Sequence, residues 1–339
     1  MLGFIHRRAS AAGRWVLGAV LLWSLSSCRA VPSEAGADRS ASAHSIVSLS
    51  DSGTWTRDVV LPLERHGAYL TVEVEIQGRA AGRWILDTGA NRSVIDQGVA
   101  ARLGLADVGG GHTLGAAGVS PVRYRGVSGL RFGSGAGLWV ASESRKLIGL
   151  SLRDLGRRMF SGIGGIVSFR ELGATAFTLD PAERTLTFHH AGLFLPPADA
   201  AATPLRLHQG LPVVAVGVDD GRGGTVWVDC LIDTGATGHV TLPESVLSAH
   251  PGVLHGGVRG ERDVRGVGGR VRSRLGVARG VEVLGFDIPD CPVGFEPAAV
   301  RDANGQGLGR IGWGVLRHLR LTLDPRHHAA YAARVSRQG

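Results

Sequence analysis

The sequence predicts an all-β fold: two β-rich lobes related by a pseudo-twofold axis, with a few short helices. Three observations lead to this prediction. The chain has 339 residues, enough for two domains of ordinary size, and its 44% hydrophobic and 19% charged residues describe a globular protein. Its 52 glycines, together with segments rich in Val, Thr and Leu, favour short strands joined by tight turns. In addition, one sequence pattern occurs twice.

The internal repeat has four landmarks in the same order. An Asp-Thr-Gly-Ala stretch begins at Asp87 and again at Asp233, 146 residues later. A glycine-rich stretch ends at Gly118 and again at Gly269, 151 residues later. The other landmarks are a hydrophobic-glycine segment at 162–165 and 309–312, and Thr-Leu-Asp-Pro at 178–181 and 322–325, with offsets of 147 and 144. Four landmarks at nearly one offset indicate two copies of one unit.

Residues 1–28 have the pattern of a lipoprotein signal peptide. Three arginines precede an apolar run over 16–25, which is too short to cross a hydrocarbon layer of about 30 Å as a helix. The run ends in Leu-Ser-Ser-Cys28, which resembles the lipobox of bacterial lipoproteins, where the cysteine is acylated. The alternative is an ordinary secretory signal with a fortuitous cysteine. We expect export in both cases, and with the lipid a place in the bacterial cell envelope, facing the periplasm or the exterior.

The rest of the chain divides into a tether and two lobes. Residues 29–56, rich in Ala, Ser, Gly and Asp, predict a flexible tether between the lipid anchor and the folded part. We expect the N-terminal lobe over 57–190 and the C-terminal lobe over 205–339. Between them, 191–204 contains a Pro-Pro pair and an Ala-rich stretch, which are typical of a linker.

Strand and helix patterns occupy matching places in the two copies. The segment YLTVEVEI (69–76) alternates apolar and polar side chains, the period of a half-buried strand. LPVVAVGV (211–218) lies at the matching place before Asp233. Further strands are expected at 185–188 and 319–324, and short helices at 93–104 and 243–250.

Cys230 and Cys291 would lie in an oxidising compartment if the chain is exported. There they could form a disulfide. Cys230 lies in the strand that leads to Asp233, so it could equally be a small buried apolar side chain. The sequence leaves both interpretations open, because it does not give the distance between the two Cα atoms.

The two Asp-Thr-Gly turns predict a pair of facing carboxyl groups. A twofold repeat places equivalent residues opposite one another where the copies meet. If the turns lie on the axis, Asp87 and Asp233 share one proton and titrate as a coupled pair. The ionised member can then deprotonate a water, while the protonated member hydrogen-bonds the carbonyl group under attack.

The repeated pattern resembles that of the retropepsin-type aspartic proteases. The shared features are hydrophobic-hydrophobic-Asp-Thr-Gly-Ala, a glycine-rich hairpin some thirty residues later, and a later hydrophobic-glycine segment. Over 57–335 the chain resembles a single-chain, two-lobed member of the kind found in bacterial aspartyl protease lipoproteins. The resemblance implies two β-barrel lobes and an endopeptidase that hydrolyses a peptide or protein substrate at an interlobe groove. It also implies a monomer without a cofactor or metal.

The resemblance assigns roles to particular residues. Asp87 and Asp233 become the catalytic dyad. Thr88 and Thr234 would cross-link the two turns, and the glycines that follow would let backbone N–H groups approach the carboxylates. The supporting residues are Thr88, Gly89, Ala90, Thr234, Gly235 and Ala236. The candidate flap residues, at the tips of the two hairpins, are Gly115, Gly118, Gly266, Gly268 and Gly269.

This sequence departs from the family pattern at three places. The later segment of the first copy, Ser161 to Gly165, has no acidic residue, although the family often has one. No aromatic residue lies at either flap tip, and Tyr124 is the nearest in the first copy. Alanine follows both turn glycines where pepsin-like enzymes have a hydroxyl residue that lowers a carboxyl pKa. We therefore expect a working range of about pH 4 to 6.

Other functions have weaker support in the sequence. A non-catalytic lipoprotein that binds a peptide or an envelope component between the lobes is the main alternative, because function resides in the site and not in the fold. GSGAGL (133–138) is more consistent with a hairpin turn than with a dinucleotide loop, since strand-like segments flank it. His189-His190 and His327-His328 are adjacent pairs that would chelate a metal poorly from a strand.

The positive charge has two interpretations. The net charge is +8, but Lys146 is the only lysine, and removal of 1–28 would lower the charge to +5. No basic block alternates with aromatic residues, so we do not expect nucleic-acid binding. The second hairpin, 258–274, carries six arginines. They could steer acidic substrates or lie near anionic lipid headgroups, or they could form a solvated strand face in an arginine-rich chain.

Overall fold

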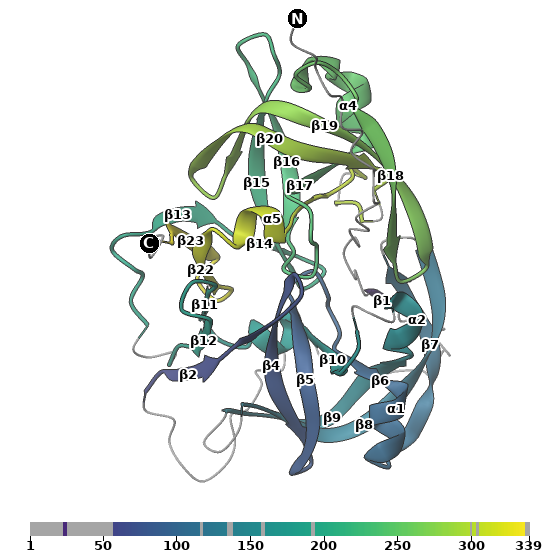
Figure 1. Cartoon of the computed structure of the whole chain (residues 1–339). Coiled ribbons are helices and arrows are strands. Elements are labelled where there is room, and N and C mark those ends of the chain that lie inside the picture. Colours follow the sequence, from purple (N-terminus) through teal and green to yellow (C-terminus); the bar gives the residue numbers. More distant parts are fainter. Residues whose placement is uncertain are drawn as a thin grey trace, which may run out of the picture.

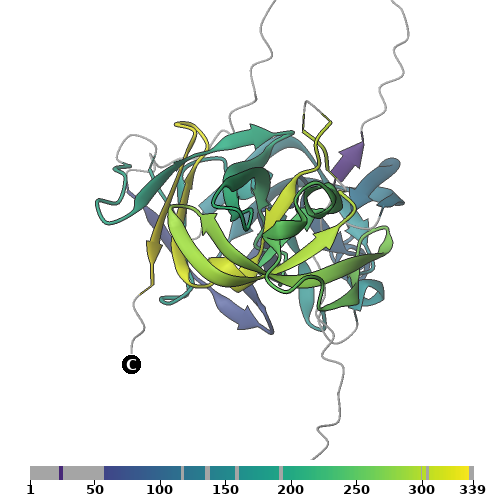
Figure 2. The ribbon, with the colours of Figure 1, turned by 90° about the horizontal axis from the view of Figure 1, so that it is seen from above.

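The two lobes lie one above the other, with a third sheet at their side (Figure 1). The computed structural model describes residues 23–25, 57–115, 118–133, 138–156, 160–190, 194–298, 300–302 and 305–335. Nearly all of its regular elements are strands, and the helices are short. The predicted fold class, all-β with two related lobes, is confirmed. Figure 2, which views the molecule from above, shows the green C-terminal lobe covering the blue N-terminal lobe.

The N-terminal lobe is built on a nine-stranded sheet in the order β1-β7-β8-β9-β6-β10-β5-β4-β3. Its strands are β1 (Trp23–Leu25), β3 (Glu64–His66), β4 (Tyr69–Ile76), β5 (Arg79–Asp87), β6 (Val94–Asp96), β7 (Asp107–Gly115), β8 (Gly118–Phe132), β9 (Leu138–Leu150) and β10 (Ile163–Ser168). Its helices are α1 (Gln97–Arg102), α2 (Leu152–Gly156) and α3 (Phe169–Leu172). β8 pairs antiparallel with β9, and most of the predicted hairpin turn between them, 134–137, lies outside the described residues.

The C-terminal lobe is built on an eight-stranded sheet in the order β14-β15-β16-β21-β17-β20-β19-β18. Its strands are β14 (Arg206–His208), β15 (Leu211–Asp219), β16 (Thr225–Ile232), β17 (Val240–Pro243), β18 (Gly260–Gly266), β19 (Gly269–Val283), β20 (Phe286–Glu296) and β21 (Gly309–Ile311). Its helices are α4 (Glu244–Ala249), the short 3₁₀ helix η1 (Pro251–Val253) and α5 (Trp313–Leu316). Apart from β1, each strand of one lobe has a counterpart at the same place in the sheet of the other.

The third sheet lies on the pseudo-twofold axis. Its order is β13-β23-β22-β11-β12-β2, so the first three strands come from one copy of the repeat and the last three from the other. Its strands are β2 (Val59–Pro62), β11 (Phe177–Asp180), β12 (Thr185–Phe188), β13 (Ala201–Pro204), β22 (Leu319–Asp324) and β23 (Ala329–Arg334). The two Thr-Leu-Asp-Pro landmarks meet at its centre, where Thr178 pairs with Thr322 and their hydroxyl oxygens are 2.6 Å apart.

One predicted offset is wrong. The hydrophobic-glycine segments were aligned at 162–165 and 309–312, but the hydrogen bonds align 165–168 with 309–312. Phe169 donates its backbone N–H to Ala90 O at 2.9 Å, and Trp313 donates to Ala236 O at 2.6 Å, a separation of 144 residues. Glycines also occupy 162 and 164 in the first copy, and Gly164 lies at a bulge in the pairing of β10 with β5, which shifts the register there.

The helix predictions were correct in place and too long. Residues 93–104 contain β6 followed by α1, because Asp96 ends the strand and caps the helix. Its carboxylate accepts hydrogen bonds from Gly98 N at 2.9 Å and Val99 N at 3.4 Å. α4 falls within 243–250 as expected. The strand β4 is buried more completely than a half-buried strand, since Thr71 also points inward and donates to Glu64 O at 3.1 Å.

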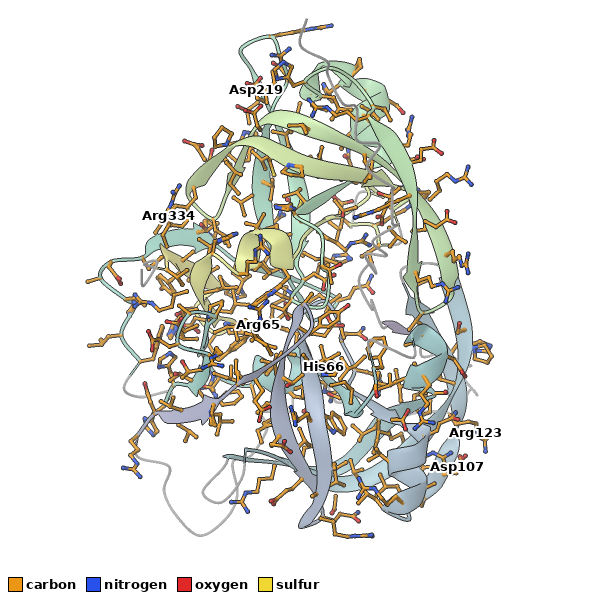
Figure 3. The ribbon with its side chains drawn as sticks, viewed as in Figure 1. Arg65, His66, Asp107, Arg123, Asp219 and Arg334 are labelled. Carbon is orange, nitrogen blue, oxygen red and sulfur yellow. The ribbon has the colours of Figure 1, made fainter. Side chains whose placement is uncertain are left out.

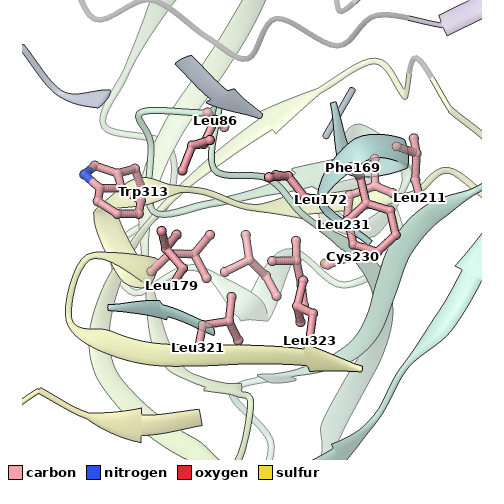
Figure 4. Packing of buried hydrophobic residues seen from close by; sticks show 14 of the residues in the cluster. Leu86, Phe169, Leu172, Leu179, Leu211, Cys230, Leu231, Trp313, Leu321 and Leu323 are labelled. Atoms are coloured by element: carbon pink, nitrogen blue, oxygen red, sulfur yellow. The ribbon is translucent and has the colours of Figure 1, made fainter. Parts of the chain in front are cut away.

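A single hydrophobic core spans both lobes and the shared sheet. Figure 4 shows Leu86 of the N-terminal lobe, Leu231 of the C-terminal lobe and Leu321 of the shared sheet in this core. Cys230 belongs to it as a free, buried thiol, and Cys291 is also free and buried. The structure therefore favours the apolar interpretation of the cysteines over the disulfide. Charged side chains such as Asp107 and Arg123, which pair at 2.8 Å, lie at the surface (Figure 3).

Most of the predicted signal peptide and tether, including Cys28, lies outside the described residues. The exception is β1, whose three residues pair with Leu114, Thr113 and His112 at the edge of β7. Among the residues that the structure describes, no helix has both the length and the apolar character that a membrane crossing requires.

Candidate active site

Asp87 and Asp233 occupy equivalent places at the ends of two central strands. Asp87 ends β5, and Asp233 directly follows β16. Each strand has a parallel neighbour that comes from the later hydrophobic segment of its own copy, β10 in one lobe and β21 in the other. The apolar residues before each Asp anchor the strand in the core, so the carboxyl groups are buried, with exposures of 1% and 0%.

The two turns are joined by hydrogen bonds that cross the twofold axis. The Thr88 hydroxyl donates to Ile232 O at 2.6 Å and accepts from Thr234 N at 3.0 Å. Its counterpart repeats the pattern, because the Thr234 hydroxyl donates to Leu86 O at 2.8 Å and accepts from Thr88 N at 3.0 Å. Each hydroxyl thus ties one turn to the strand that leads into the other. This network fixes both aspartates relative to each other.

This network leads to a stability prediction. Thr88→Val removes the hydroxyl and leaves Thr234 N and Ile232 O buried without their partner, which is expected to lower the free energy of unfolding by about 3 kcal/mol. Thr88→Ser keeps the hydroxyl and should lose about 1 kcal/mol. Urea unfolding at one pH measures both. Equal midpoints for the two variants would show that the hydroxyl does not hold the turns together.

The carboxyl groups face each other across the glycines of the turns. Oδ1 of Asp87 accepts from Gly89 N at 2.9 Å, and Oδ1 of Asp233 accepts from Gly235 N and Ala236 N, both at 3.0 Å. A Cβ atom on Gly89 would lie 2.5 Å from Cγ of Asp233, and one on Gly235 would lie 2.4 Å from Cγ of Asp87. Within the described residues, Oδ2 of each aspartate is buried and has no hydrogen-bond partner other than the facing carboxyl group. These two oxygens are free to hold a polar ligand.

The surroundings make the two aspartates chemically unequal. Burial, and after it the charge of Asp233, holds the pKa of Asp87 well above its ordinary value. Burial also raises the pKa of Asp233, but the nearby Arg310 guanidinium opposes this, and the result is a pKa of about 6. The Arg310 guanidinium therefore favours the ionised form of Asp233 over that of Asp87.

The two flap hairpins, β7-β8 and β18-β19, meet at their tips on the right side of Figure 1. A Cβ atom on Gly115 would lie 2.0 Å from Val267 O, and one on Gly268 would lie 2.3 Å from Gly118 O. The glycines are therefore required for the close approach of the two backbones. Gly266 and Gly269, also predicted, pair with each other at the tip of the second hairpin.

The residues near the site include some to which the sequence assigned no role. Tyr69, the first residue of β4, is buried, and its pKa is raised by burial and by the charges of Asp87 and Asp233. Tyr124, named only as the nearest aromatic to a flap, lies 6.0 Å from the Arg92 guanidinium, which stacks over its ring. Ser168, which pairs with Asp87, is the counterpart of Gly312 once the offset is corrected, whereas Gly312 already belongs to a landmark of the repeat. The alternating pattern of β4 does not show that Tyr69 lies near the two aspartates, because the sequence does not tell which end of the strand reaches the catalytic turns.

In the described part of the chain, one histidine of each adjacent pair contacts other side chains. His189 contacts Asp58 through Nδ1 at 2.6 Å and Thr178 through Nε2 at 2.7 Å, and His327 contacts Asp324 at 2.5 Å. No group of three or more His, Cys, Asp or Glu side chains in these residues could hold a metal ion.

Comparisons with known proteins give one family match. A family model described as aspartyl protease matches residues 72–141. Among solved structures, the chain is similar to basic 7S globulin from soybean, with 13% sequence identity, a TM-score of 0.47, and coverage of 83% of this chain and 95% of that chain. None of the curated proteins that were compared matches the chain. The chain is thus aspartyl protease-like over the segment that carries the first Asp-Thr-Gly turn and the first flap.

Proposed function

We propose that this protein is an aspartic endopeptidase whose catalytic dyad is Asp87 and Asp233. The observation that carries the proposal is the pair of buried carboxyl groups, which face each other at the twofold axis and each have one oxygen whose only partner is the other carboxyl group. Such a pair shares a proton, so it offers a base and an acid at one place.

Because Asp233 ionises more readily than Asp87, the two aspartates take different parts in the reaction. Ionised Asp233 takes a proton from a water held between the carboxyl groups, and the water oxygen bonds to the peptide carbonyl carbon. Protonated Asp87 hydrogen-bonds the carbonyl oxygen and transfers its proton to it, which gives a neutral gem-diol. Asp87 then takes a proton from the diol, and Asp233 gives its proton to the amide nitrogen. The C–N bond breaks, and both products leave with the dyad again singly protonated.

We also propose that the protein acts outside the cytoplasm, anchored through a lipid on Cys28 and working as a monomer. The support is the sequence of residues 1–28 and the presence of both halves of the site in one chain.

A digestion experiment tests the activity. Purified protein and its Asp87→Asn and Asp233→Asn variants are incubated with a mixed peptide library, with and without the transition-state-mimicking inhibitor pepstatin, and products are read by mass spectrometry. We expect cleavage only by the wild type and inhibition by pepstatin. Equal cleavage by all three proteins would rule out the dyad. Peptide capture without products from any of them would favour a binding lipoprotein.

The pH dependence provides a second test. Because Asp233 must be ionised, the rate should fall about tenfold per unit below its pKa of about 6, which places the acid limb at the upper end of the range expected from sequence. A hydroxyl introduced by Ala236→Ser or Ala90→Ser can donate to the carboxyl group of its own turn, which stabilises the singly ionised pair, lowers its first pKa and moves the acid limb downward. The measurement is kcat/KM against pH. An acid limb that stays in place or moves upward in both variants would contradict the assignment.

A further inference from the structure

The two halves of the site differ in polarity at equivalent positions. The flap strands pair Gly111 with Val122 in the first hairpin and Arg262 with Ser273 in the second, each four residues from the tip. On the neighbouring strands, Ile166 pairs with Ile85, and its equivalent Arg310 pairs with Leu231. At these equivalent positions the N-terminal lobe has Val and Ile, and the C-terminal lobe has Ser and Arg. We therefore call the N-terminal side of the site its apolar half and the C-terminal side its polar half.

The next equivalent pair shows the same difference. Leu150 pairs with Asp96, which precedes α1, and Glu296 pairs with Pro243, which precedes α4. Leu150 packs against a hydrophobic cluster in the N-terminal lobe. Glu296 is buried and forms a salt bridge with Arg310, which is buried as well.

The apolar half of the site already holds a side chain. Val267, at the tip of the C-terminal flap, is 2% exposed and belongs to the hydrophobic cluster of the other lobe. The cluster also contains Tyr69 and Ala90, which lie at the dyad. A β-branched aliphatic side chain thus fits this half of the site.

The polar half, which belongs to the C-terminal lobe, contains the half-buried side chain of Arg262. Arg262 is half-buried on the inner face of β18, and its guanidinium lies 3.6 Å from the place of a Cβ atom on Gly238, in the loop after the catalytic turn. Glu296 is the nearby acid and is already paired with Arg310, and among the described residues Arg262 forms no salt bridge of its own. In the described residues, Nε of Arg262, Nε of Arg310 and Oγ of Ser273 are buried without a hydrogen-bond partner.

A half-buried cation without a salt-bridge partner favours an anionic ligand. Arg262 differs in this from Arg272 on the same hairpin, whose side chain is 70% exposed and lies 3.5 Å from Glu261 and 3.8 Å from Asp263. The six arginines of this hairpin are therefore not equivalent. Arg272 is part of a solvated strand face, whereas Arg262 points toward the site.

We propose that the site selects peptides with an aliphatic side chain on one side of the scissile bond and an acidic side chain, bound by Arg262, on the other. This rests on the proposed function. The aliphatic side chain takes the place of Val267 in the apolar cluster when the flaps open. A carboxylate accepts hydrogen bonds from the Arg262 guanidinium and forms the ion pair that this side chain lacks.

The test compares peptides that differ only at the scissile bond, with Val on one side and Glu, Gln or Arg on the other, in both orders. In one order, kcat/KM of the wild type should be higher for Glu than for Arg by about thirtyfold, as expected for a partly buried charge pair. Arg262→Leu should remove the preference and Arg262→Lys should keep part of it. Arg272→Leu, the matched control, should leave it unchanged.

The outcomes separate the specificity from the activity. Cleavage of all peptides at equal rates would overturn the specificity and leave the endopeptidase intact, as would equal effects of Arg262→Leu and Arg272→Leu. If no peptide is cleaved, the endopeptidase fails, and equilibrium binding of the same fluorescent peptides to the Asp87→Asn variant decides the specificity. Tighter binding of the Glu peptides, lost in Arg262→Leu, would support it; equal binding of Glu and Arg peptides would overturn it.

Discussion

Asp233→Asn is expected to lower kcat/KM by about 10⁴-fold while making the folded protein more stable at neutral pH. The loss of activity follows because an amide cannot take a proton from water. The gain in stability follows from burial, since the folded protein excludes the charged form of a carboxyl that water would solvate. A variant that loses its activity and becomes more stable cannot have lost that activity through unfolding.

The sign of the stability effect follows from linkage. Folding raises the pKa of Asp233 from an ordinary 3.8 to about 6, so the folded state resists ionisation. Below about pH 3.8 the group is protonated in both states and has no effect on stability. Above pH 6 ionisation favours unfolding by about 3 kcal/mol. Asn has no such ionisation, so the gain should be present above pH 6 and should disappear as the pH falls toward 3.8.

Thermal unfolding at pH 3.5 and pH 7.5 measures this difference. Asp287→Asn, at an exposed position on β20, serves as the control and should leave the melting temperature unchanged at both values. A lower melting temperature of Asp233→Asn at pH 7.5 would show that the carboxylate stabilises the fold, contrary to the raised pKa.

Gly235→Ala is expected to lower kcat/KM by about 10²-fold to 10³-fold and to destabilise the fold by about 2 kcal/mol. The new Cβ atom would lie 2.4 Å from Cγ of Asp87, well inside contact distance. Relief requires either the turn or the carboxyl to move. Because crossed hydrogen bonds from Thr88 and Thr234 fix the turns, the carboxyl is displaced from its partner.

Two further glycine-to-alanine variants are compared with Gly235→Ala, one at the equivalent turn of the first copy and one at an exposed position. Gly89→Ala should have a similar effect, because its Cβ atom would meet Cγ of Asp233 at 2.5 Å. Gly260→Ala should be neutral, since nothing lies within 4 Å of its Cβ position. Steady-state kinetics and urea unfolding of the three variants check this. Wild-type activity in Gly235→Ala would mean that the carboxyl groups do not need this spacing.

The sequence alone determined the fold class and the pairing of the dyad. Two Asp-Thr-Gly turns at an offset of 146 residues imply a twofold arrangement, and symmetry then brings Asp87 and Asp233 together without any knowledge of the strands between them. Turn chemistry is local, so the roles of Thr88 and Gly89 could be expected from the pattern around them.

Only the tertiary structure decided how the two halves differ. The charge on Arg310 lowers the pKa of Asp233 relative to that of Asp87, and Val267 crosses from its own flap into the opposite lobe. Both effects depend on side chains that are far apart in sequence and close in space. A repeat predicts what its two copies share. Packing across the axis fixes what distinguishes them, because burial and charge act on each aspartate through neighbours that the turn sequence does not contain.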